Sequence, residues 1–175
     1  MNLPNLLTIF RILLVPIFII FVIQNDLWMA LVIFIMAGIT DGLDGLLARV
    51  LNQRTVIGSY LDPIADKMLL ISAYISLTIK GMLPGWLSVI VVSRDIIILA
   101  GIAVISLMGK GLDIHPSLSS KMTTVFQILT IIITLCAFKK YPAAWNGFVV
   151  ATAVFTVLSG LQYMYRGIKT MGEIT

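Results

Sequence analysis

The stretch D-G-L-D-G-L-L-A-R runs from Asp41 to Arg49, and G-S-Y-L-D-P-I-A-D follows from Gly58 to Asp66 after a spacer of eight residues. The whole chain has only eight acidic residues, and four of them lie in these two runs: Asp41, Asp44, Asp62 and Asp66. Charged side chains in or beside membrane spans are costly and usually mark a function. In a chain as apolar as this one, the four aspartates are therefore the first candidate site.

The spacing of these aspartates predicts that they converge. Asp41 and Asp44 are three residues apart, so on a helix they share a face. Asp62 and Asp66 are four apart and do the same. Asp62 followed by Pro63 predicts a helix start with Asp62 as the N-cap, whereas a helix that begins earlier would be kinked by Pro63. Two helix ends joined by a short loop would bring the two pairs together.

Converging carboxylates predict a metal site. They repel one another strongly in a low-dielectric setting unless a cation lies between them. Oxygen-only ligand sets suit Mg²⁺ or Mn²⁺, and two such ions are typical of displacement at phosphorus. Glycines at 42, 45 and 58 leave room for a ligand against the backbone, and Arg49 supplies a cation for a phosphate. The alternative is that the Asp-Gly pairs form turns and that Gly38 and Gly42 serve helix packing.

The full pattern, D-x2-D-G-x2-A-R-x8-G-x3-D-x3-D, resembles the signature of the CDP-alcohol phosphotransferases, integral-membrane enzymes of phospholipid synthesis. Every fixed position of that signature is matched. The resemblance implies two divalent metals, Mg²⁺ or Mn²⁺, held by the four aspartates, with Asp66 as general base on the acceptor hydroxyl. It also implies a CDP-diacylglycerol donor that is bound near Gly45, Ala48, Arg49, Thr55 and Gly58.

A second run, P-N-x-x-T-x-x-R from Pro4 to Arg11, resembles the start of the glycerophospholipid branch of that family, where it borders the nucleotide pocket. Asn5, Thr8 and Arg11 are spaced three apart, so they share one helical face. We therefore add Asn5 and Thr8 to the expected CDP-diacylglycerol contacts. An ordinary interfacial anchor is the alternative.

The composition predicts the fold class. The chain has 175 residues, of which 59% are hydrophobic and 11% charged, too few charges to cover the surface of a soluble domain. We predict one all-α domain over residues 1–175, a polytopic membrane protein with a short interfacial helix in residues 1–10. Six apolar runs of about 20 residues predict six transmembrane helices, at about 11–24, 27–48, 63–79, 84–108, 117–138 and 143–165.

The basic residues predict the orientation. With the N-terminus in the cytoplasm, eight basic residues fall on the cytoplasmic side: Arg11, Arg49, Arg54, Lys67, Lys110, Lys121, Arg166 and Lys169. Three fall outside: Lys80, Lys139 and Lys140. This orientation puts the aspartates on the cytoplasmic face, and we expect a bacterial inner membrane. The net charge of +4 fits anionic lipid better than nucleic acid here.

The fourth and fifth predicted spans bear on the acceptor. Relatives that use glycerol 3-phosphate usually carry a second arginine in the fourth span, where this chain has Gly101. They also carry a second lysine in the fifth span, where this chain has Thr123. The runs here look more like the CMP-forming cardiolipin synthases, whose acceptor, phosphatidylglycerol, has one fewer negative charge. We expect acceptor contacts from Arg94 and Lys121.

Each of these expectations has an alternative. The alternative acceptor is glycerol 3-phosphate, and the product would then be phosphatidylglycerophosphate. Arg94 and Asp95 could instead form a structural ion pair with a neighbouring helix. The polar groups of the fifth span could instead serve helix–helix contacts: Lys121, Thr123, Thr124 and Gln127.

Two other function classes are disfavoured. A cation transporter would need a polar path across the membrane, yet the aspartates lie at one side only. A catalytically silent lipid-binding homologue would be expected to have lost a signature residue. The resemblance further suggests a homodimer that contacts membrane lipids and no nucleic acid.

Overall fold

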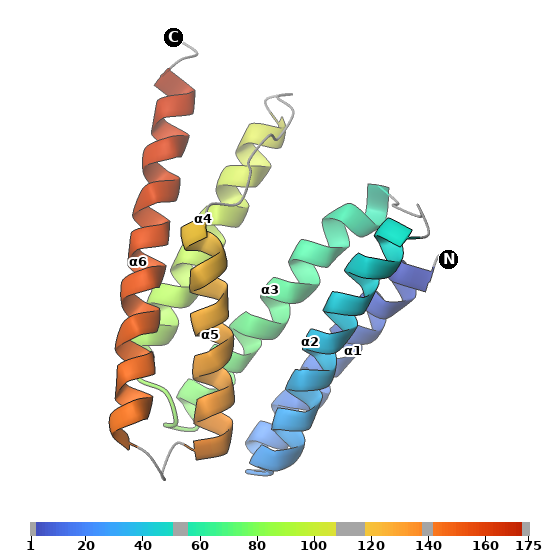
Figure 1. Ribbon diagram of the computed structural model, residues 1–175, viewed down its shortest axis with the longest axis vertical. Coiled ribbons are helices and arrows are strands. Elements are labelled where there is room, and N and C mark those ends of the chain that lie inside the picture. The colour runs from blue at the N-terminus through green and yellow to red at the C-terminus, as the bar shows by residue number, and fades with distance from the viewer. Residues whose placement is uncertain (1–2, 51–55, 108–117, 138–141, 173–175) are drawn as a thin grey trace. The chain divides into compact units, whose positions relative to one another are not determined.

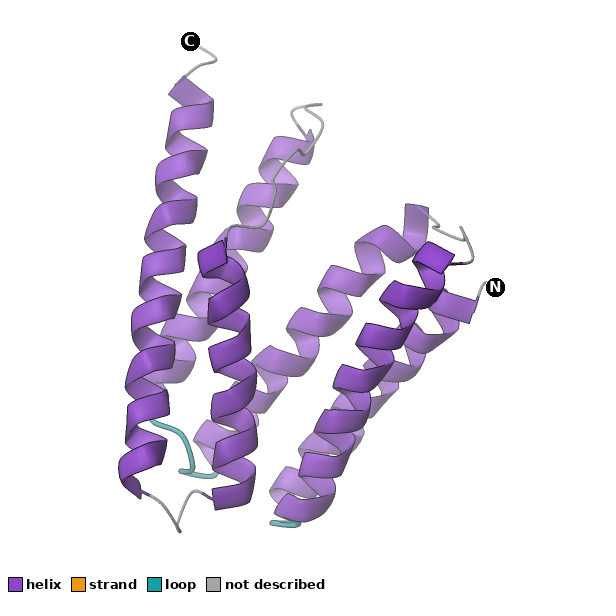
Figure 2. Ribbon diagram, in the orientation of Figure 1, coloured by secondary structure: helices purple, strands orange, loops and turns teal. Residues whose placement is uncertain are grey.

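The structure, a computed structural model, describes residues 3–50, 56–107, 118–137 and 142–172. These ranges include the turns at 24–26 and 80–84. Side chains are described for residues 6–43, 64–101, 119–136 and 142–165. Throughout these ranges the backbone is helical or forms a short connection, and no strand occurs in them (Figure 2). The all-α prediction is therefore confirmed for the described part of the chain.

Six helices are described, and they correspond in order to the six predicted spans. Their bounds are α1 Leu3–Ile23, α2 Leu27–Val50, α3 Val56–Ile79, α4 Gly85–Leu107, α5 Leu118–Ala137 and α6 Pro142–Gly172. Within the described residues, three segments are long and apolar enough to cross a membrane: Leu6–Ile23, Ser119–Cys136 and Pro142–Tyr165. A shorter apolar segment covers Leu27–Leu43. Crossing of the membrane by all six helices remains a prediction.

The starts of two helices bear on the predictions. Helix α1 is continuous from Leu3 to Ile23, so residues 3–10 join the first predicted span in one helix, and a separate interfacial helix is not confirmed. Helix α3 begins at Val56, so the prediction of Asp62 as its N-cap was wrong, and Pro63 lies inside the helix. Proline is tolerated inside membrane helices because neighbouring groups satisfy the backbone that it leaves unpaired.

The chain forms two compact units, the first of which comprises Met1–Leu83 and Thr134–Cys136. In this unit α1 packs against both α2 and α3. Phe18 and Val22 of α1 are fully buried, and the ring of Phe18 lies 5.9 Å from that of Phe34 on α2. Figure 1 shows the start of α1, the end of α2 and the start of α3 at the same end of this unit. That end carries both halves of the aspartate signature.

The second unit comprises Pro84–Ile133 and Ala137–Thr175. Helix α6 packs against α4, and threonine hydroxyls join it to α5. The Thr123 hydroxyl donates to the Phe155 carbonyl at 2.9 Å, and the hydroxyls of Thr130 and Thr152 lie 2.7 Å apart. Because hydroxyls inside a membrane bundle need partners, these bonds fix α5 against α6.

Candidate active site

Helices α2 and α3 position the signature aspartates. Asp41 and Asp44 both lie on α2, and Asp62 and Asp66 both lie on α3, so each pair does share a helical face. The side chains of Asp41 and Asp66 are described, whereas those of Asp44 and Asp62 lie outside the described side chains. The geometry of the site is therefore known for one member of each pair.

Arg11 joins these two carboxylates. Its Nη1 atom lies 3.0 Å from Oδ1 of Asp41 and also donates a hydrogen bond to Oδ1 of Asp66. One nitrogen of α1 thus holds an oxygen from α2 and an oxygen from α3. The convergence expected from the spacing is present for Asp41 and Asp66, and a cation lies between them.

The pairing of Arg11 with the aspartates was not predicted. Arg11 was expected on the helical face of Asn5 and Thr8 and on the cytoplasmic side of the membrane. A signal was nevertheless present, because Arg11 is the first basic residue of the chain and the next is Arg49. A lone cation inside an apolar helix requires an acidic partner, and the signature aspartates are four of the eight acidic residues of the chain.

The three side chains differ in exposure. The Arg11 side chain is 1% exposed, whereas that of Asp41 is 46% and that of Asp66 38% exposed. The Arg11 side chain is therefore buried, and both carboxylate side chains are partly open to solvent. A ligand can reach the carboxylate oxygens without entering the packed core.

The expected CDP-diacylglycerol contacts lie on the same helices, with one exception. Thr8 is fully buried on α1, one turn before Arg11. Gly45, Ala48 and Arg49 follow Asp41 on α2, and Gly45 and Ala48 continue its helical face. Gly58 lies on α3 and Asn5 on α1, but apart from Thr8 these side chains are outside the described ones, and Thr55 is outside the described residues.

The donor chemistry fits divalent metal ions. Both described acids offer carboxylate oxygens, the ligands preferred by Mg²⁺ and Mn²⁺. Their Oδ1 atoms already meet at one positively charged nitrogen, which shows that both can approach a single cation. Among the side chains that the structure describes, no group of three or more acids, histidines or cysteines is close enough to hold a metal. A complete ligand set requires Asp44 and Asp62, which lie outside them.

Arg94 forms a second charged centre, in the other unit. Its side chain is 4% exposed, and Nη1 donates to Oδ1 of Asp95 at 2.7 Å. Its Nη2 atom donates to the hydroxyls of Ser120 on α5 and Ser159 on α6, both at 2.7 Å. Arg94 therefore has an acid on its own helix and two hydroxyls on neighbouring helices, and an acceptor would have to compete with these bonds.

The polar residues of α5 divide into two groups. Thr123 and Gln127 are fully buried, and the bond from Thr123 to the Phe155 carbonyl is a helix–helix contact. Thr124 donates to the Ser120 carbonyl of its own helix at 3.2 Å. Lys121 is exposed and lies in the first turn of α5, where its charge can reach a ligand or solvent.

Comparison with known proteins adds the context of a family. The family model described as CDP-alcohol phosphatidyltransferase matches residues 1–159, which include every signature position. The chain is 32% identical over 192 residues to the cardiolipin synthase (CMP-forming) of Homo sapiens, an alignment that covers 99% of this chain and 64% of that protein. The chain thus spans less than two thirds of the human protein.

Two bacterial relatives match along more of their length. The probable phosphatidylglycerophosphate synthase of Mycobacterium tuberculosis is 34% identical over 181 residues, covering 99% of this chain and 85% of that protein. The CDP-diacylglycerol–glycerol-3-phosphate 3-phosphatidyltransferase of Bacillus subtilis is 33% identical over 185 residues, covering 94% of each chain.

Proposed function

Because the chain belongs to the CDP-alcohol phosphatidyltransferase family, we propose that it transfers the phosphatidyl group of CDP-diacylglycerol to a glycerol-type hydroxyl and releases CMP. The observation that carries this proposal is the convergence of Asp41 and Asp66, one from each half of the signature, on a single cation. Both carboxylates are open to a ligand, as a site that handles a diphosphate requires.

In the proposed reaction, Asp66 accepts the proton of the acceptor hydroxyl. The hydroxyl oxygen then attacks the β-phosphorus, and the bond between that phosphorus and the oxygen of CMP breaks, so that CMP leaves with the electron pair. Asp41, Asp44, Asp62 and Asp66 would hold two Mg²⁺ or Mn²⁺ ions, which would polarise the diphosphate and stabilise the charge on CMP. Arg49 offsets phosphate charge beside them.

Several of the remaining proposed nucleotide contacts lie on the helices that carry the aspartates. Gly45, Ala48 and Gly58 let the ligand approach the backbone of α2 and α3. Asn5 and Thr55 would complete the pocket of the nucleotide, and Thr8, which is fully buried, would have to become exposed to contact the ligand. We place this site at the cytoplasmic face of a bacterial inner membrane, in a single domain that forms a homodimer.

For the acceptor we favour phosphatidylglycerol, which would make the product cardiolipin. Relatives named for each of the two products match at 32–34% identity, so identity does not separate them. The preference rests on Gly101 and Thr123, which stand where two further cations would serve a phosphomonoester. Arg94 and Lys121 supply the acceptor contacts. Glycerol 3-phosphate is the second candidate.

The test is an acceptor screen on the purified full chain in detergent, with CDP-diacylglycerol and Mg²⁺. Phosphatidylglycerol should give CMP and cardiolipin. A product formed only from glycerol 3-phosphate would leave the enzyme class standing and overturn the choice of acceptor. Asp66→Asn should release no CMP while it elutes as a folded protein; unchanged transfer would remove Asp66 from the role of base. CMP release also separates an enzyme from a cation transporter.

A further inference from the structure

Arg11 occupies the position of a cation between Asp41 and Asp66. A single nitrogen, Nη1, bonds the Oδ1 atoms of both acids, although Arg11 and Asp66 are 55 residues apart. These two contacts of Arg11 connect α1 to α2 and to α3. Arg11 therefore bonds two of the carboxylates that would hold the proposed metal ions.

The charges of the site place Arg11 and the proposed metal ions in competition for these carboxylates. One positive charge on Arg11 offsets one of the four negative charges of the signature aspartates, whereas two divalent ions would offset all four. A guanidinium held at the carboxylate oxygens would then be repelled by the metal ions at short range, where the dielectric is low.

The exposure of the side chains indicates how the exchange proceeds. The Arg11 side chain is buried, whereas the side chains of Asp41 and Asp66 are partly exposed. Divalent ions can therefore reach the acids from solvent. The long and flexible stem of arginine allows the guanidinium to withdraw while α1 keeps its place.

We propose that Arg11 is the counter-ion of the metal site, which binds Asp41 and Asp66 when divalent ions are absent and is displaced when they bind. The proposal rests on the metal site of the proposed function and adds a residue that sets its metal affinity. Arg11 thus lowers the repulsion between the acids before metal binds and competes with the metal afterwards.

The test measures Mn²⁺ binding to the full chain in detergent by the electron paramagnetic resonance signal of unbound Mn²⁺. Arg11→Gln removes the competing charge and should lower the Kd for Mn²⁺ on the order of tenfold, the scale of one charge-assisted hydrogen bond. Lys80→Gln is the matched control, because it removes an equal charge in the turn after α3, at the other end of that helix from Asp66, and its Kd should equal that of the wild type. A Kd for Arg11→Gln that is unchanged or higher overturns the proposal.

Asp66→Asn separates this proposal from the proposed function. If the wild type binds Mn²⁺ and Asp66→Asn binds it more weakly, the metal site stands, and the Arg11→Gln result alone decides the role of Arg11. If the wild type binds no Mn²⁺, both proposals fail.

A second measurement needs no variant that could fail to fold. Phenylglyoxal modifies accessible arginines, and mass spectrometry reports the modified fraction at each position. In the wild type, Mg²⁺ should raise the modification of Arg11 several-fold and leave that of Arg94 unchanged. Modification of Arg11 that stays constant or falls with Mg²⁺ would show that metal does not displace it.

Discussion

Gly101 of α4 lies against the ring of Tyr163 of α6, so that a Cβ atom added to Gly101 would be 3.0 Å from Cε1 of Tyr163. The same Cβ would be 3.2 Å from the tyrosine oxygen. The Tyr163 hydroxyl donates to the Ile98 carbonyl at 3.4 Å, which ties the ring to α4. An arginine at position 101 would have to displace this ring.

Gly101→Ala should destabilise the protein, although alanine in a helix interior gains roughly 1 kcal/mol over glycine. The added methyl group meets a ring that is bonded in place, and overpacking of this kind costs about 1–3 kcal/mol. The melting temperature in detergent measures the change. Gly160→Ala is the matched control on the same helix pair, because its Cβ would lie an ordinary 3.6 Å from Cγ of Arg94. If Gly101→Ala melts at or above the wild-type temperature, the ring moves freely.

The contact between Gly101 and Tyr163 also allows a test of how the acceptor is selected. Gly101→Arg alone should fold poorly, whereas Gly101→Arg with Tyr163→Ala provides both the cation and the space for it. The double variant should raise the ratio of glycerol 3-phosphate to phosphatidylglycerol use by about tenfold, the scale of one charge-assisted bond. Tyr163→Ala alone is the control, and its ratio should stay at the wild-type value. Equal ratios in the two variants would remove position 101 from acceptor selection.

Arg94 and Asp95 should contribute to stability as a pair. Arg94→Met leaves Asp95, which is fully buried, without the charge that compensates it, and such a loss typically costs about 3–5 kcal/mol. Arg94→Met with Asp95→Leu should be less destabilised than Arg94→Met alone, because the buried charge is gone. Melting in detergent compares the three proteins.

The kinetics of Arg94→Lys test the proposed role of Arg94 in binding the acceptor. Lysine keeps the charge but cannot reach Asp95, Ser120 and Ser159 with one planar group. A purely structural arginine predicts a lower melting temperature with an unchanged KM for the acceptor. A raised KM at an unchanged melting temperature would instead support the acceptor contact proposed for Arg94.

The sequence was sufficient for the features that depend on local pattern. Apolar runs located the six helices, and the three- and four-residue spacings put each aspartate pair on one helix. Contacts between distant helices could not be predicted in this way. The bond from Arg11 to Asp66 joins residues 55 apart, and the contact between Tyr163 and Ile98 joins residues 65 apart. The start of α3 was missed because Pro63 is a strong local signal that the surrounding helix overrides.

Removal of divalent ions should abolish CMP release, and the aspartates of the signature should be responsible. EDTA should stop the reaction, and added Mg²⁺ or Mn²⁺ should restore it. Asp41→Asn removes a charged ligand and should lower the rate by about 100-fold or more, since loss of one group that stabilises developing charge costs this much. The rate of CMP release from CDP-diacylglycerol is the measurement.

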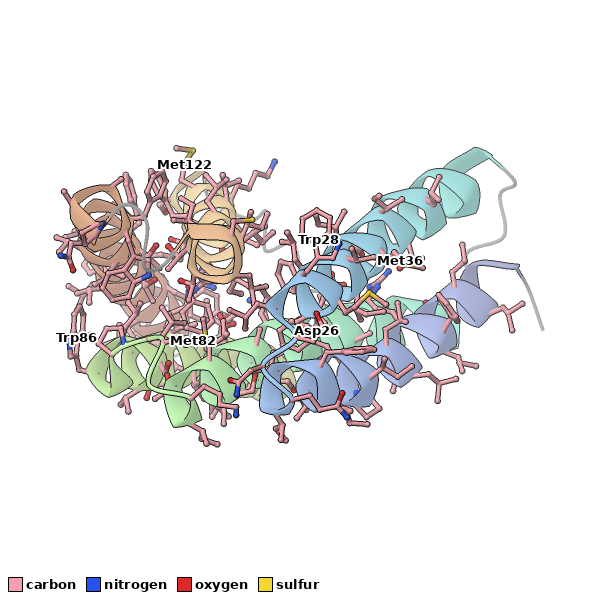
Figure 3. The ribbon with its side chains drawn as sticks, turned by 90° about the horizontal axis from the view of Figure 1, so that it is seen from below. Asp26, Trp28, Met36, Met82, Trp86 and Met122 are labelled. Atoms are coloured by element: carbon pink, nitrogen blue, oxygen red, sulfur yellow. The ribbon has the colours of Figure 1, made fainter. Side chains whose placement is uncertain are left out.

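Asp26 supplies the control for that prediction. It lies just before α2 (Figure 3). Its Oδ1 accepts a hydrogen bond from the Met29 amide at 3.1 Å. Asp41 lies fifteen residues further along, about 22 Å at the rise of an α-helix. Asparagine caps helices as well as aspartate does, so Asp26→Asn removes an equal charge without loss of the cap. Asp26→Asn should therefore keep wild-type activity; if it lost as much as Asp41→Asn, net charge and not metal binding would explain both losses.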